Sequence, residues 1–354
     1  MANDSDKEYH MDSNGHKLDS RQKRMEEANG SSVAKGASAS SRVVIFCAAI
    51  LIMSFQPLVL HLAGDKRSSE EKDLGADGFM LAAELVKFLL CATVVFARKI
   101  IGLETIVWCG MEHTAPFGVP AAIYLVMNIM KVFTARALSP PVFQLLASTK
   151  ILSTALASWA FLGKVLTASQ WLAMLLLTVG VALGQHRANS GLDDLDAAPL
   201  IPTLIMILNS FLSAAGGVYT EKVLKARHSA SLTIFATNLH MSAHTLLLNM
   251  LKACMLGVPF IPRLWHLGPW TWAALFNEAI NGILVSALMK HADTIVKNYA
   301  FAASIFVTAA LSVPLLQYWP QMHFFFGAIL VVISMWLYYT HQPIKSNGHG
   351  KKKS

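Results

Sequence analysis

Long apolar runs separated by short polar segments repeat along most of the chain. A helix needs about 20 mostly apolar residues to cross a bilayer, where only closed backbone hydrogen bonding is tolerated. Ten runs have this length. The predicted membrane helices cover residues 43–63, 79–97, 118–138, 140–163, 167–185, 199–222, 231–255, 270–289, 293–316 and 322–341. The pattern therefore predicts an all-α integral membrane protein with ten transmembrane helices.

Polar segments divide this pattern into a tail, two halves and a second tail. Residues 1–42 and the basic residues 342–354 have compositions typical of disordered segments. The polar linker 186–198 separates a first half, 43–185, from a second half, 199–341. Together the halves form a predicted transporter domain at 43–341. Within the first half, two consecutive prolines at 140 and 141 predict a tight hairpin between the third and fourth helices.

Five helices in each half imply a repeat that is inverted in the membrane. Such inverted repeats place a binding site near the bilayer midplane, between the halves. Lysine and arginine are more frequent in the segments that are cytosolic when both termini are cytosolic. We therefore expect two five-helix inverted repeats, with the N-terminus and the C-terminus both inside.

The composition agrees with a membrane protein and argues against other classes. The chain is 54% hydrophobic and 14% charged, with a mean hydropathy of +0.47, which is too apolar for an ordinary soluble domain. The net charge of +8 does not indicate nucleic acid, because many basic residues flank apolar runs. The four cysteines lie far apart and show no metal-binding spacing, so we expect neither a disulfide framework nor a metal site.

Charged residues inside the predicted helices are the strongest candidates for function. A lysine at the bilayer centre costs about 3 kcal/mol, so it usually meets water, a partner or a ligand. Lys150 lies about ten residues, or ~15 Å, into its predicted helix, too deep to reach the headgroups easily. Its expected partner is either an anionic ligand or an internal carboxylate such as Glu84 or Glu278. Lys297 lies nearer a helix end, where reaching toward the interface also explains it.

Other polar residues fall on shared helix faces. Glu84 and Lys87 are three residues apart and are expected to form a structural ion pair inside the membrane. Tyr124 and Asn128 are four residues apart, a spacing that suits either helix packing or a flat polar ligand such as a nucleobase. The eighth helix carries a polar stripe of Asn277, Glu278 and Asn281, which indicates a cavity lining.

A histidine pair supports an alternative from another class of protein. His240 and His244 have the i, i+4 spacing of some zinc sites, but no glutamate follows the first histidine. A membrane-embedded metal-dependent enzyme that uses this pair is therefore the second hypothesis. A third hypothesis is a carrier of a small phosphorylated metabolite or an amine.

Several short motifs occur together in a characteristic order. They are AELVKFLL, GVPAAIYLVMN, VFQLLASTKILSTAL, SQW, SAAGGVYTEKVLKA, TNLHMS, NGILVSALMKHADTIVKNYAFAAS and a final WLYY. With these motifs, residues 43–341 resemble the nucleotide-sugar transporters that carry CMP-sialic acid, UDP-galactose or UDP-N-acetylglucosamine, within the drug/metabolite transporter superfamily.

The resemblance implies a ten-helix carrier that exchanges a cytosolic nucleotide sugar for a lumenal nucleoside monophosphate. It implies no catalytic residue, metal or cofactor. Lys150 and Lys297 match the family lysines that face the nucleotide phosphate. Asn281 stands where the family often has glycine, so the resemblance does not imply which base or sugar is preferred. The expected substrate-binding residues are Lys150, Lys297, Tyr124, Asn128, Ser213, Asn238 and Asn281.

The substrate and location follow from smaller features. We favour a UDP-sugar, either UDP-N-acetylglucosamine or UDP-galactose, with CMP-sialic acid as the alternative. The C-terminal KKKS resembles a dilysine signal for retrieval to the endoplasmic reticulum, carried by Lys351 and Lys352. The expected location is the membrane of the Golgi or endoplasmic reticulum. Expected partners are the two nucleotides, membrane lipid, a second copy of the chain in a homodimer, and coat proteins that bind the dilysine.

Overall fold

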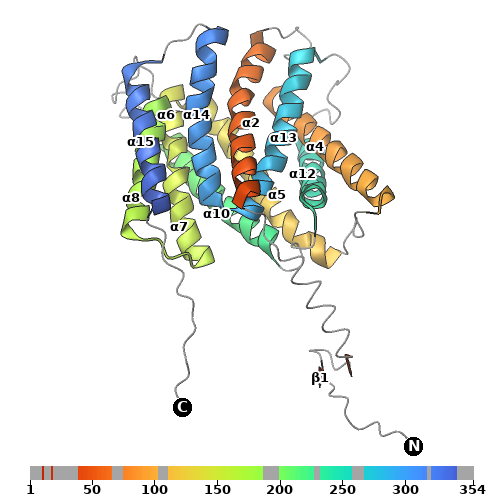
Figure 1. Ribbon diagram of the computed structural model, residues 1–354. Coiled ribbons are helices and arrows are strands. Elements are labelled where there is room, and N and C mark those ends of the chain that lie inside the picture. The colour runs from red at the N-terminus through yellow and green to blue at the C-terminus, as the bar shows by residue number, and fades with distance from the viewer. Residues whose placement is uncertain are drawn as a thin grey trace, which may run out of the picture.

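A bundle of long helices accounts for most of the chain (Figure 1). The computed structural model describes residues 10–11, 17–18, 39–65, 75–102, 111–185, 199–226, 232–256, 267–316 and 320–340. The helices are α2 (Ala39–Asp65), α4 (Gly75–Ile100), α5 (Met111–Ala137), α6 (Pro140–Ser148), α7 (Lys150–Leu162), α8 (Ala168–Gln185), α10 (Leu200–Lys225), α12 (Ile234–Leu256), α13 (Pro269–His291), α14 (Thr294–Leu316) and α15 (Met322–Thr340).

Two short strands precede the bundle. β1 (His10–Met11) pairs with β2 (Lys17–Leu18) in antiparallel register. The rest of the predicted tail up to residue 38 lies outside the described residues, and so do the linker 186–198 and the tail 342–354 with Lys351 and Lys352. The all-helical prediction for the membrane part agrees with the structure, and α2 begins four residues before the predicted start at 43.

Nine helical segments in the described ranges are long and apolar enough to cross a membrane. They correspond to all the predicted spans except 231–255, which the structure forms as α12. That helix is long enough, at 23 residues, but it carries many polar side chains. It packs beside α4 and α5 and keeps several polar residues buried, including Asn238, His240 and Ser242. Its low hydropathy therefore reflects an interior position rather than exposure to water.

The fourth predicted helix, 140–163, is interrupted in the middle. Thr149 separates α6 from α7, and its backbone N–H donates to the Leu146 carbonyl at 3.2 Å, three residues back. The hydroxyls of Ser148 and Thr149 donate to the Leu145 and Leu146 carbonyls, each at 2.6 Å. Serine and threonine hydroxyls that bond back to helix carbonyls compete with the regular ladder and bend helices. The interruption places Lys150 at the first position of α7.

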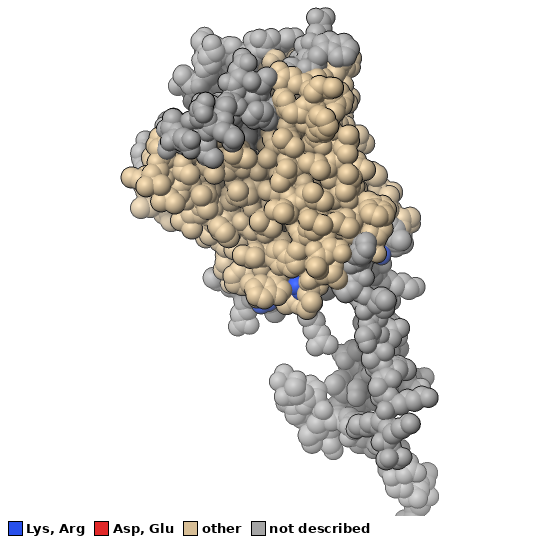
Figure 2. All heavy atoms as spheres, turned by 90° about the vertical axis from the view of Figure 1, so that its left-hand side faces the viewer, with Lys and Arg blue, Asp and Glu red and all other residues tan. Residues whose placement is uncertain are grey.

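The first helix of the bundle begins on the same side of the molecule as the last helix ends. In Figure 1 the start of α2 and the end of α15 both point toward the lower side. Figure 2 shows one flank of the bundle, which is covered by uncharged residues, with lysine or arginine visible along its lower edge. Many exposed side chains on α8 and α15 are large and apolar, including Leu172, Leu175, Phe326, Val332 and Trp336. An apolar flank of this kind suits contact with lipid.

Helices α8 and α15 approach each other closely through glycines. A Cβ at Gly327 would lie 2.6 Å from the Gly180 carbonyl oxygen and 2.8 Å from the Gly184 nitrogen. Both neighbours are backbone atoms, so they cannot turn aside as a flexible side chain can. Small residues at such crossings let two membrane helices pack backbone to backbone. The buried Ser334 hydroxyl adds a hydrogen bond to the Ala173 carbonyl at 2.6 Å.

Gly327→Leu is expected to lower the stability of the protein by about 3 kcal/mol, because overpacking forces the two backbones apart. The measurement is the thermal unfolding temperature in detergent. Ile329→Leu is the matched control, since Ile329 is 55% exposed on the same helix and should tolerate the change. Equal unfolding temperatures for the two variants would contradict the close crossing.

Candidate functional site

A cavity lies between helices from both predicted halves of the chain. Its volume is about 100 Å³. Helices α2 and α7 contribute residues from the first half, and α10 and α14 contribute residues from the second. The lining residues are Met53, Lys150, Thr154, Ser213, Lys297, Asn298 and Phe301.

Both candidate lysines line this cavity, and neither is paired with an acid in the described part of the chain. The Lys150 ammonium lies 4.0 Å from the centre of the Phe301 ring, a distance at which the ring face attracts the cation. The internal acids named as alternative partners are engaged elsewhere. Glu84 pairs with Lys87 at 2.7 Å, and Glu278 accepts a hydrogen bond from Gln56.

Lys297 lies against Gly217 of α10, a residue without a side chain. A Cβ at Gly217 would stand 3.2 Å from the Lys297 ammonium and 3.1 Å from the Thr294 methyl group. The neighbouring Gly216 has a similar role toward Ile123 on α5, where a Cβ would lie at 2.8 Å. The two glycines therefore let α5 and α14 approach α10 on either side, next to the cavity.

The structure brings three of the expected substrate-binding residues together, Lys150, Lys297 and Ser213. The remaining four do not line this cavity. The Tyr124 hydroxyl lies 3.4 Å from the Thr220 hydroxyl, and Asn128 is half-buried one turn further along α5. Asn238 is buried in α12, where its amide nitrogen donates to the Ile234 carbonyl and its oxygen accepts from Ser286.

Asn281 belongs to a second polar cluster between α2, α4 and α13. Its amide nitrogen donates to the Gln56 oxygen at 3.3 Å, and Gln56 in turn donates to Glu278. Lys87 lies over Gly282 of the same helix α13, where a Cβ would meet its side chain at 3.1 Å. The stripe predicted on the eighth helix is thus in contact with the Glu84–Lys87 pair and with α2.

Sequence reasoning missed four residues of the cavity. Met53, Thr154 and Phe301 are ordinary residues of membrane helices, and Asn298 is an uncharged residue that directly follows Lys297 in the sequence. Helical spacing carries a signal for two of them, because Thr154 follows Lys150 by four residues and Phe301 follows Lys297 by four. Met53 belongs to a predicted helix without a charged residue, so no charge at helical spacing indicated that it lines a cavity.

The histidine pair is arranged as packing rather than as a metal site. The His240 ring stacks on Phe117 with 6.0 Å between ring centroids, and a His244 ring nitrogen lies 2.9 Å from the His240 carbonyl oxygen. Across the described residues, no three side chains of His, Cys, Asp or Glu are grouped closely enough to hold a metal ion. The geometry therefore gives the metal-dependent hypothesis no support.

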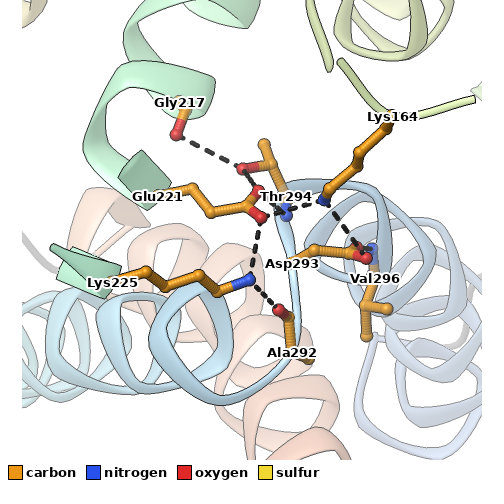
Figure 3. A network of polar contacts seen from close by, with 8 residues as sticks. All are labelled: Lys164, Gly217, Glu221, Lys225, Ala292, Asp293, Thr294 and Val296. Carbon is orange, nitrogen blue, oxygen red and sulfur yellow. Dashed lines mark hydrogen bonds and ion pairs between the residues drawn. The ribbon is translucent and has the colours of Figure 1, made fainter. Parts of the chain in front are cut away.

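A network of charged residues lies at one end of the bundle, where α10 ends and α14 begins (Figure 3). Its centre is Glu221 of α10, whose side chain is 0% exposed. One carboxylate oxygen accepts from Lys164 at 2.9 Å and from Lys225 at 2.8 Å. The other oxygen accepts from the backbone N–H and the hydroxyl of Thr294, at 2.8 and 2.7 Å.

Other contacts of the network tie the same helices together. Lys164 also lies 3.5 Å from Asp293, whose second oxygen accepts the Val296 N–H at 2.8 Å and so caps the start of α14. Lys225 donates to the Ala292 carbonyl between α13 and α14. The segment after α7, the end of α10 and the start of α14 are therefore joined by hydrogen bonds at one end of the bundle.

Comparison with known proteins identifies the family of this chain. A family model described as nucleotide-sugar transporter matches residues 39–339, which is most of the chain. The chain belongs to the nucleotide-sugar transporter family. The resemblance drawn from the motifs is thereby confirmed. The family consists of transporters, and the nine long apolar helices in the described ranges agree with a multi-pass membrane protein.

Curated relatives of this nucleotide-sugar transporter include carriers of two kinds of substrate. The CMP-sialic acid transporter 1 of Arabidopsis thaliana is 29% identical over 66% of this chain and 73% of its own length. The UDP-galactose translocator of Bos taurus is 28% identical over 85% of this chain and 79% of its own. A crystal structure with a TM-score of 0.61 and 16% identity covers 85% of this chain and 96% of its own, and it shows a shared fold.

Proposed function

We propose that this nucleotide-sugar transporter exchanges a cytosolic nucleotide sugar for a lumenal nucleoside monophosphate. The single observation that carries the proposal is the shared cavity of Lys150 and Lys297, where neither ammonium has an acidic partner among the described residues. Cations buried without a partner are costly, and a phosphate group compensates them well in a site of low dielectric. The same pair of cations serves the incoming nucleotide sugar and the returning monophosphate, which is the requirement for exchange.

The proposed architecture has ten membrane helices in two inverted halves of five. In this arrangement α6 and α7 together form the fourth crossing and α12 forms the seventh. The cavity draws its lining from both halves, as expected for a carrier that alternates access around a central site. The start of α2 and the end of α15 lie on the same side, which supports an even number of crossings. We propose that this side is cytosolic.

The proposed transport cycle begins with entry of the anionic substrate from the cytosol. Its phosphate meets Lys150 and Lys297. The Lys150 ammonium is held over the Phe301 ring, and the Lys297 ammonium lies against Gly217 of α10. The Glu221 network lies on the proposed cytosolic side, so its formation closes that side of the cavity. Release then occurs toward the lumen, and a monophosphate occupies the vacated cationic site for the return step.

We favour a UDP-sugar, UDP-N-acetylglucosamine or UDP-galactose, and CMP-sialic acid is the alternative. The relatives include carriers named for UDP-galactose and for CMP-sialic acid, so they support both. A diphosphate bridge offers two negative charges, which match two lysines more closely than a single phosphodiester does. We place the transporter in the Golgi or the endoplasmic reticulum, with Lys351 and Lys352 as a retrieval signal for coat proteins and a homodimer as its assembly.

A panel uptake assay tests the proposal. Purified protein in liposomes preloaded with UMP or CMP is expected to take up one or two nucleotide sugars from a labelled set of UDP-, CMP- and GDP-sugars. Preloading should raise uptake at least roughly tenfold over empty liposomes, because the return step carries the binding site back. Uptake of no nucleotide sugar by folded protein would overturn the proposal, and uptake of a small phosphorylated metabolite or an amine, insensitive to UMP and CMP, would favour the third hypothesis.

A further inference from the structure

Asn298 presents a buried hydrogen-bond donor that nothing in the described structure satisfies. Its side chain is 3% exposed and lines the cavity beside Lys297. The amide nitrogen is fully buried and has no hydrogen-bond partner. Leaving such a donor unpaired costs about 1–3 kcal/mol, and buried polar groups in folded proteins are nearly always paired. The position therefore calls for an acceptor that arrives with a ligand.

The charged groups of the cavity lining are hydrogen-bond donors only. The ammonium groups of Lys150 and Lys297 can only donate. The Thr154 hydroxyl already donates to the Lys150 carbonyl, at 2.7 Å. No carboxylate belongs to the described lining. A ligand that satisfies the two ammonium groups and the Asn298 amide must bring several acceptor oxygens close together, as a phosphate group does.

We propose that Asn298 donates a hydrogen bond to a phosphate oxygen of the transported nucleotide, beside Lys150 and Lys297. This inference rests on the proposed function and extends its phosphate subsite by a neutral donor. A hydrogen bond from an amide contributes less than one from a charged group. A third cation would hold the phosphate more tightly in every state, whereas exchange requires that the nucleotide leave on both sides. The amide orients the phosphate and adds less to that retention than a third cation would.

Affinity measurements with and without the phosphate test the role of Asn298. Inhibition of nucleotide-sugar uptake is measured for UMP and CMP and for the corresponding nucleosides, uridine and cytidine. Asn298→Ala is expected to weaken inhibition by the monophosphates roughly 5- to 10-fold, the range of a neutral hydrogen bond, and to leave the nucleosides unchanged. Asn249→Ala is the matched control, because the Asn249 amide donates to the Thr245 carbonyl of its own helix.

A second variant separates binding from folding. Asn298→Leu keeps a similar volume and removes the unpaired donor, so the empty protein is expected to unfold at the same or a higher temperature. The same variant should lose affinity for the monophosphates. A lower unfolding temperature with unchanged inhibition constants would overturn the inference and assign Asn298 to packing.

Two further outcomes have distinct meanings. Equal loss for monophosphates and nucleosides in Asn298→Ala would also overturn the inference, because the amide would then act on the nucleoside rather than on the phosphate. Wild-type protein that transports nucleotide sugar while both Asn298 variants behave as wild type would overturn the inference alone. Wild-type protein that transports no nucleotide sugar would instead overturn the proposed function.

Discussion

Lys150→Met is expected to reduce exchange of nucleotide sugar by roughly 30-fold or more in liposomes, with Lys150→Ala giving the same result. In the proposed site, the charge-assisted contact from Lys150 to a desolvated phosphate is one of two such contacts, and losing one partner of such a pair costs about 2–5 kcal/mol. The methionine side chain retains the length of the lysine stem, so the cavity keeps its shape. The loss is therefore expected to come from the missing charge.

The folded state should survive this change. Because Lys150 has no acidic partner in the described structure, removing its charge relieves the cost of burying it, and the unfolding temperature should stay the same or rise. Lys222→Ala is the control for removal of a lysine, since Lys222 is exposed near the end of α10. Unchanged uptake by Lys150→Met would remove the phosphate role and with it the main support for the proposed site.

Glu221→Ala is expected to abolish exchange for a different reason. The carboxylate accepts hydrogen bonds from Lys164, Lys225 and Thr294, and the variant leaves all of these donors without it. Removing one partner of a buried ion pair costs about 3–5 kcal/mol. A cost of that size shifts the equilibrium between closed and open states by roughly 150- to 5,000-fold. A carrier that cannot close one side cannot complete a cycle, even though its binding site is intact.

Labelling of the cavity measures this shift. A single cysteine at Thr154, in a variant without the native cysteines, should react faster with an impermeant thiol reagent applied from the side of Lys164 when Glu221 is alanine. Inhibition by UMP should remain within a few-fold of the wild-type value, which distinguishes an open gate from a misfolded protein. Glu84→Gln is the control for breaking an intramembrane ion pair outside the network, because Glu84 pairs with Lys87, and this variant should leave the labelling rate unchanged. Normal exchange by Glu221→Ala would show that the network does not close the transporter.

The overall plan of the molecule could be predicted because the bilayer imposes a simple rule on sequence. Apolar runs of sufficient length gave nearly every helix, and the two consecutive prolines correctly indicated the turn between α5 and α6. The break at Thr149 was missed because it depends on hydroxyl groups that bond to the preceding turn, and those hydroxyls do not lower hydropathy enough to interrupt an apolar run.

The site was predicted in part, because charge in an apolar helix is conspicuous and a neutral side chain is not. Lys150 and Lys297 stood out on this ground, and the structure places both at one cavity. Phe301 has only its helical spacing from Lys297 to indicate it, and Asn298 could be recognised only once the helices were packed. The Glu221 network was missed since its members Lys164 and Asp293 are distant in sequence and look like ordinary charges at helix ends.

The small volume of the cavity has a consequence for how affinities should be interpreted. Sites for molecules of drug size usually occupy about 300–1,000 Å³, and a nucleotide sugar is larger than a space of about 100 Å³ can hold. Binding of the proposed substrate is therefore expected to include the work of expanding the site. The observed dissociation constant would then equal the intrinsic one divided by the fraction of molecules already expanded. Two substrates with identical contacts will then differ in apparent affinity when they require different degrees of expansion. Selectivity between sugars can in this way arise at residues that touch neither sugar.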